Sequence, residues 1–136
     1  MAKKKPAAAK KFAAMSTTPL ASIAANVAPA TTPPTPVITV PPGGTLLVIV
    51  DVGPMRVPYT VSYRGRTLIK SLVDRAENVP LQPGEEVLGW HFNHMLKGWH
   101  HTIGVSVNGG APIILEDKSE ADKDQDTSFG FAIVKA

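Results

Sequence analysis

Residues 87–107, VLGWHFNHMLKGWHHTIGVSV, hold both tryptophans and all four histidines of the chain, and their pattern decides the expected fold. A four-residue loop over residues 95–98, closed by glycine, predicts a β-hairpin. Because side chains alternate along a strand, this register makes one face apolar and ready to join a core. The facing pairs on it are His94 with Trp99, Phe92 with His101, Trp90 with Ile103, and Leu88 with Val105.

The opposite face of the predicted hairpin is polar and flat. It consists of His91, Asn93, His100, Thr102 and Ser106, around Gly89 and Gly104. A slip of one residue would mix the two faces, so their clean separation supports the register. We expect this polar face to be a contact face, and its two histidines to be a pair that can sense pH.

The rest of the second half and the middle of the chain consist of short apolar stretches separated by turn residues. Candidate strands cover residues 37–40, 45–52, 57–63, 67–73, 112–115 and 127–134. The continuous apolar run at 45–52 predicts a central strand covered on both faces. Residues 74–84 hold two prolines and predict a loop that crosses between sheets, whereas Asn108-Gly109-Gly110 predicts a hairpin turn. About eight strands without a convincing helix indicate an all-β fold, an antiparallel β-sandwich of immunoglobulin-like or jelly-roll type over residues 37–136.

Residues 1–36 differ from the rest, since they are rich in Ala, Lys, Pro, Thr and Ser and precede the first acid, Asp51. We interpret them as a basic arm whose apolar residues are too sparse for a core. Thr18 and Pro19 predict the start of a short helix over residues 19–27, which needs a partner surface because isolated helices below about 12 residues are unstable. The arm is too weakly apolar for a secretory signal. Its anchors are Phe12, Leu20, Ile23 and Val27, and its basic residues are Lys3, Lys4, Lys5, Lys10 and Lys11.

Three interpretations of the arm stay open. It is a solvated tail, or it contacts nucleic acid through phosphates, or it docks on a neighbouring copy. In the third case an acidic loop over residues 116–126 supplies the opposite charge. The acids of that loop are Glu116, Asp117, Glu120, Asp122, Asp124 and Asp126. Docking explains the most residues, because a solvated tail needs no capped apolar stripe.

We find no motif that indicates a metal, a cofactor or a catalytic centre. The predicted register lets at most two histidines converge, and a metal site needs three or four ligands. The alternating Asp122, Asp124 and Asp126 begin a calcium-loop pattern, but its glycine and closing carboxylate are missing, which favours a solvated loop. The chain has no cysteine, no G-x-S-x-G and no P-loop. We therefore expect a chain that is not an enzyme and binds no cofactor.

A basic arm followed by a compact β-sandwich is similar, in layout, to viral coat, cement and decoration proteins. The expected function is thus a non-enzymatic, accessory component of a virus or phage particle (decoration, cement or minor capsid), located in the virion or otherwise in the cytoplasm. No apolar run reaches the ~18 residues that cross a membrane. The alternative is a carbohydrate-binding module in which Trp99 and Tyr59 or Tyr63 stack on sugars, although such rings are more often buried in a core.

Overall fold

The computed structural model describes residues 34–136, in which residues 35–136 form one compact unit. The helix predicted over residues 19–27, the arm anchors and the arm lysines lie outside the described residues. Within residues 34–136 every regular element is a strand, and no helix there is long and apolar enough to span a membrane.

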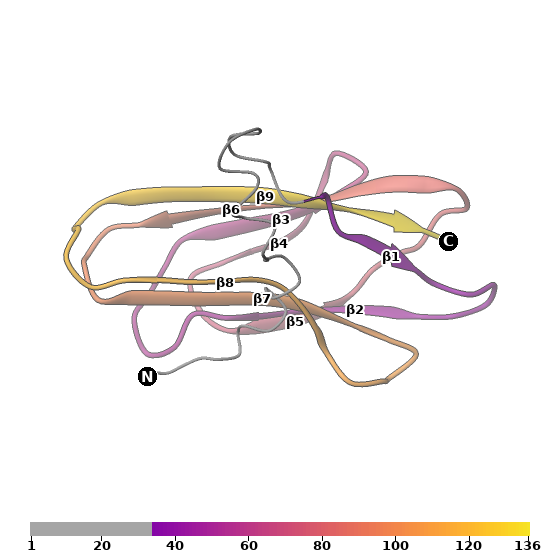
Figure 1. The fold of residues 1–136 in the computed structure, drawn as a ribbon, viewed down its shortest axis with the longest axis horizontal. Helices are drawn as coiled ribbons and strands as arrows, with labels where there is room; N and C mark the ends of the chain where they lie inside the picture. The colour runs from indigo at the N-terminus through magenta and orange to yellow at the C-terminus, as the bar shows by residue number, and fades with distance from the viewer. Residues whose placement is uncertain (1–33) are drawn as a thin grey trace, which may run out of the picture. The chain divides into compact units, whose positions relative to one another are not determined.

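Nine strands form two sheets stacked as a sandwich, so the predicted all-β architecture is confirmed (Figure 1). The five-stranded sheet contains, in spatial order, β1 (Val37–Thr39), β9 (Asp126–Lys135), β6 (Glu85–His94), β3 (Tyr59–Tyr63) and β4 (Arg66–Ser71). The four-stranded sheet contains β5 (Arg75–Asn78), β2 (Leu46–Asp51), β7 (Trp99–Val107) and β8 (Ile113–Glu120). All neighbouring strands are antiparallel except β1 and β9, which are parallel.

The predicted hairpin over residues 87–107 is wrong. β6 pairs with β3 and β9, whereas β7 pairs with β2 and β8, so residues 95–98 carry the chain from one sheet to the other. The alternation of apolar and polar residues indicates which side of a strand faces the core, but it does not indicate which strand is the hydrogen-bonded neighbour. The apolar face was therefore identified correctly, while its partner was not.

The side chains predicted to face each other in the hairpin meet across the core instead. The ring of His94 stacks on Trp99 with centroids 3.6 Å apart, and Phe92 stacks on His101 at 3.8 Å. The rest of the core follows the same rule of alternation along each strand. Its fully buried aliphatic residues include Val48, Val61, Leu88, Ile103, Val105 and Val134.

Three other predictions about individual strands need correction. Strand β5 lies within residues 74–84, which were expected to be a loop. The strand was missed because its sequence, RAEN, shows no alternation of apolar residues. β8 includes residues 116–120 of the predicted acidic loop, which leaves residues 121–125 to connect β8 to β9. β2 lies inside its sheet as expected, but it is fully covered on one face only, since Leu47 and Ile49 are half-buried.

Two tight turns match their sequences. Asn108 and Gly109 have φ angles of 52° and 74°, and the hairpin they were predicted to form joins β7 to β8. Arg64 and Gly65, at 56° and 75°, join β3 to β4 in the same way. Two consecutive positive φ angles are typical of a type I′ turn, whose twist suits a β-hairpin.

Candidate functional site

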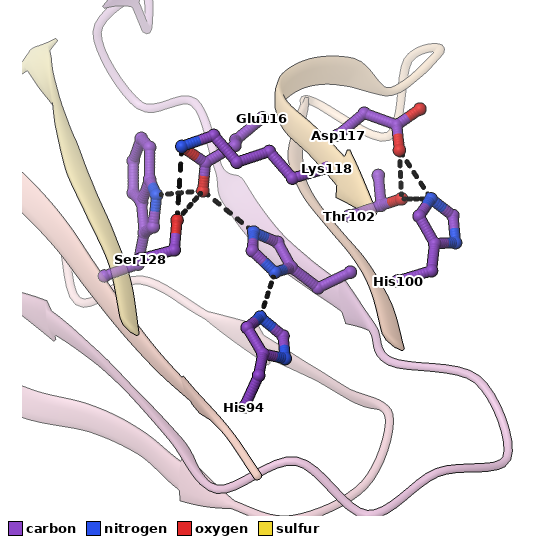
Figure 2. Close-up of polar contacts among 9 residues, drawn as sticks. His94, His100, Thr102, Glu116, Asp117, Lys118 and Ser128 are labelled. Carbon is purple, nitrogen blue, oxygen red and sulfur yellow. Dashed lines mark hydrogen bonds and ion pairs between the residues drawn. The ribbon is translucent and has the colours of Figure 1, made fainter. Parts of the chain in front are cut away.

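A polar cluster, which we call the buried histidine cluster, lies between the two sheets and consists of Trp90, His94, His101 and Glu116. Figure 2 labels His94 and Glu116 at its two ends. Glu116 Oε1 accepts hydrogen bonds from His101 Nε2 at 2.8 Å and from Trp90 Nε1 at 3.0 Å. His101 Nδ1 lies 2.8 Å from His94 Nε2. Both imidazoles are completely buried. The hydrogen bonds connect residues of β6, β7 and β8 in one chain.

One end of this chain has a fixed direction. Glu116 is an acceptor, so His101 donates to it from Nε2. At the other end, Nε2 of His94 shares a hydrogen bond with Nδ1 of His101, and Nδ1 of His94 is buried without a partner. Protonating His94 would therefore bury an N–H that has nothing to bond, in addition to a positive charge.

The pKa of His94 is lowered from 6.5 to about 4, mainly by burial of the imidazole and secondly by the neighbouring His101. At Glu116, burial acts to raise the pKa, but the hydrogen bond from His101, the charge of Lys118 and the bond from Trp90 outweigh burial and lower it. The cluster therefore holds a neutral His94 and an ionised Glu116.

The outer end of the cluster is closed by Lys118 and Ser128. Lys118 Nζ lies 3.4 Å from Glu116 Oε2 and 3.3 Å from the hydroxyl of Ser128 (Figure 2). Ser128 contacts Glu116 and Lys118 but neither imidazole. The two histidines and Glu116 lie in sequence along a chain of bonds, and no group of three metal ligands is found among residues 34–136. The arrangement suits a structural link between the sheets.

The predicted contact face is split between the two outer surfaces of the sandwich. His91 and Asn93 of β6 lie on the outside of the five-stranded sheet, and His100, Thr102 and Ser106 of β7 lie on the outside of the other. His91 and His100 thus form no pair. The cause is the crossing at residues 95–98, which places β6 and β7 in different sheets.

Polar residues of β7 are satisfied within their own sheet. His100 and Thr102 both contact the carboxylate of Asp117 on β8 (Figure 2). Ser106 is 5% exposed and donates to the carbonyl of Gly110 at 2.7 Å. The outside of the four-stranded sheet therefore offers few free polar groups along β7.

An apolar surface occupies the outside of the five-stranded sheet. Strand register places its residues in adjacent rows: Ile133 lies beside both Val37 and Val87, Phe131 beside Gly89, and Phe129 beside His91. Phe129 is 72% exposed and Phe131 51%. We call this surface the β9 face, and its apolar residues are Val37, Val87, Phe129, Phe131 and Ile133.

Sequence reasoning noted the alternation of Phe129, Phe131 and Ile133 but did not identify the β9 face. The alternate residues of β9, Ser128, Gly130 and Ala132, face inward. Gly130 faces Trp90, and a Cβ added there would lie 2.9 Å from the indole ring. The indole takes the space that a phenylalanine of β9 would have filled. The available signal was the run of small residues, Ser128, Gly130 and Ala132, between the large ones.

A shallow hollow of about 440 Å³ continues the same outer surface toward the β3–β4 edge. Leu72 on its wall is 41% exposed, and His91 joins the hollow to the β9 face, with its ring centroid 6.2 Å from that of Phe129. The hollow is lined by Pro58, Tyr59, Thr60, Lys70, Ser71, Leu72, His91 and Asn93.

The three rings predicted to stack on sugars are all buried. Trp99 is 4% exposed, and Tyr59 and Tyr63 are 3% exposed. The hydroxyl of Tyr59 donates to the carbonyl of Val73, and that of Tyr63 accepts from the backbone of Gln82. These rings serve the core, as expected of aromatics in a sandwich.

The predicted acidic loop divides into residues with different environments. Glu116 belongs to the buried histidine cluster, and Asp117 bonds His100 on the surface. Glu120 ends β8 and Asp126 begins β9, which leaves Asp122 and Asp124 in the connection itself.

No family model matches the chain, and comparison with curated proteins and with solved structures finds no significant match.

Proposed function

We propose that this chain is a non-enzymatic structural protein that works inside a larger assembly. The observation that supports this best is the β9 face, where two phenylalanines stand largely in solvent on a flat sheet. A contiguous exposed apolar patch on a folded protein is typical of a surface that another protein covers. The aromatic rings also provide the large contact area that interface centres favour.

The distribution of chemistry-bearing groups supports a structural role. His94 and His101 are buried in the core, and Glu116, which is largely buried, contacts Lys118 and Ser128 at its outer end. The hollow at the β3–β4 edge brings together one lysine and one histidine, without a nucleophile activated by a base. His94 and Glu116, both with a lowered pKa, thus belong to a hydrogen-bonded link between the two sheets.

Within this class we propose an accessory component of a virus or phage particle, such as a decoration, cement or minor capsid protein. Support comes from the layout, a basic arm joined to a compact β-sandwich, together with a face for a neighbour. The protein would then be located in the particle. A sugar-binding role is not retained, because the rings that would stack on sugars are buried.

We also propose that the sandwich is of the immunoglobulin-like rather than the jelly-roll type. The order β9-β6-β3-β4 corresponds to the G-F-C-C′ order of immunoglobulin variable-type sheets. The hairpin β7–β8 would be an addition between the strands that correspond to F and G.

Deleting residues 2–34 tests the proposed function. Because the core lies in the unit of residues 35–136, we expect the shortened chain to keep its β-sheet circular dichroism. It should lose incorporation into the large particle, which gradient sedimentation of extracts containing either form would measure.

A shortened chain that sediments with the particle as efficiently as the full chain would refute the role of the arm. Full-length protein found only in the slowly sedimenting fractions of its native source would refute the assembly role altogether. The nucleic-acid interpretation of the arm would be supported instead if the full-length chain bound free nucleic acid with an affinity that falls steeply with salt, and the shortened chain did not bind.

A further inference from the structure

We propose that the β9 face is the receptor for the arm segment 19–27 of a neighbouring copy of this chain. The inference rests on the proposed assembly function and names the partner. The face is apolar at its centre, and segment 19–27 supplies a matching apolar stripe through Leu20, Ile23 and Val27. An amphipathic helix laid on a hydrophobic surface uses this i, i+3, i+7 spacing.

The dimensions of the two partners agree. Nine residues of helix span about 13 Å at 1.5 Å per residue. The distance along β9 from Phe129 to Ile133, four residues of strand, is also about 13 Å. One short helix therefore covers the whole apolar length of the face.

The length of the chain before β1 makes a neighbouring copy accessible to segment 19–27. β1 runs parallel to β9, and Ile133 N donates to Pro36 O, so residue 36 lies beside Ile133 at the edge of the sheet. From Ile133 back to Asp126 the strand is about 23 Å long. A proline-rich spacer of nine residues, 28–36, can span up to about 28 Å. This reach exceeds the length of β9 behind Ile133, so the spacer is long enough for segment 19–27 to bind a neighbouring copy, as the proposed assembly requires.

Charge gives the docked helix a direction. The segment from the end of β8 to the start of β9, residues 120–126, is acidic, with Glu120, Asp122, Asp124 and Asp126 against Lys123. It lies at the Phe129 end of the face, because β9 begins at Asp126. The arm lysines precede Leu20 in the chain, so they meet this acidic end when the helix runs parallel to β9. At the other end the ion pair of Lys135 with Glu85, 3.4 Å apart, forms a polar rim.

Photo-crosslinking of the full-length protein tests this docking. Benzoylphenylalanine replaces Leu20 in one preparation and Val27 in another, and each is mixed with an equal amount of isotope-labelled chain. We expect crosslinks between unlike isotopes. The probe at position 20 should reach the peptide around Phe129, and the probe at position 27 should reach Ile133 or Val87.

The double variant Phe129→Ser/Phe131→Ser should reduce the crosslink yield at least tenfold. The control Leu96→Ser, which removes an apolar residue that is 63% exposed but lies away from the face, should leave the yield unchanged. Crosslinks within one isotope only, crosslinks to the four-stranded sheet, or a yield insensitive to the double variant would overturn the inference. If crosslinking fails while deletion of residues 2–34 still abolishes incorporation, the proposed function stands and the arm binds elsewhere.

Discussion

At the scale of single residues, the unusual feature of this molecule is a pair of histidines inside a β-sandwich. His94 is enclosed by Phe92, Trp99 and His101, and its Nδ1 has no hydrogen-bond partner. Burial of the imidazole lowers its pKa to about 4 and so favours the neutral form. The folded structure therefore disfavours the addition of a second proton to the His94 imidazole.

We predict that the stability of the protein falls as pH drops below about 6.5. The pKa of His94 is near 4 in the folded protein and near 6.5 when unfolded, so in this window only the unfolded state takes up the proton. The full effect is about 3 kcal/mol, gained as pH rises from 4 to above 6.5. Glu116, whose pKa is lowered, adds to the loss below its ordinary pKa of 4.5.

Urea unfolding at several pH values measures this effect. The variant His94→Gln, which keeps a polar side chain without a titratable group, should show a much flatter dependence between pH 4.5 and 6.5. The control His91→Gln removes an exposed histidine of the same strand and should keep the slope of the wild type. An unchanged slope in His94→Gln would contradict the assignment of the buried titration to His94.

At the scale of elements, β9 shows how packing decides which side of a strand faces inward. Phe129 and Phe131 look like core residues, yet the inward positions belong to Ser128, Gly130 and Ala132. Trp90 on β6 fills the space over Gly130, so the larger side chains of β9 are left outside.

A methyl group at residue 130 should destabilise the protein. Gly130→Ala places a Cβ about 3 Å from three atoms of the Trp90 indole, so the ring must move. We expect a loss of about 1–3 kcal/mol, as for other overpacked cores. Thermal or urea unfolding monitored by tryptophan fluorescence measures it.

The matched control for this substitution is Gly89→Ala, on the neighbouring strand, where an added Cβ would lie 3.3 Å from the Ser62 hydroxyl and 3.8 Å from the Gly130 carbonyl oxygen. We expect it to cost clearly less than Gly130→Ala. Equal effects of the two substitutions would show that the Trp90–Gly130 contact does not fix the orientation of β9.

The same elements show how far the sequence predicts this fold. Alternation placed Leu88, Trp90 and Phe92 in the core correctly, because it depends only on the local geometry of a strand. It could not tell that β6 and β7 lie in opposite sheets, since pairing depends on partners far away in the chain. The contact face predicted from pairing was therefore split, and the β9 face was missed because its orientation depends on Trp90.

At the scale of the whole molecule, the two outer surfaces of the sandwich differ in character. The four-stranded sheet carries the surface contacts among His100, Thr102 and Asp117, and its edge strand β8 exposes Ile113 and Ile114. The five-stranded sheet presents Phe129 and Phe131, the exposed phenylalanine rings of residues 34–136. Because aromatic side chains are enriched at interface centres, we expect a partner to cover the five-stranded sheet.

Hydroxyl-radical footprinting of the native assembly and of the dissociated protein tests the central claim, that a partner covers the β9 face. Phe129 and Leu96 have similar exposure in the isolated chain, 72% and 63%, so Leu96 serves as an internal standard. The account predicts that assembly lowers the oxidation rate of Phe129 at least fivefold and leaves that of Leu96 nearly unchanged. Equal oxidation of Phe129 in the assembled and the dissociated protein would contradict it.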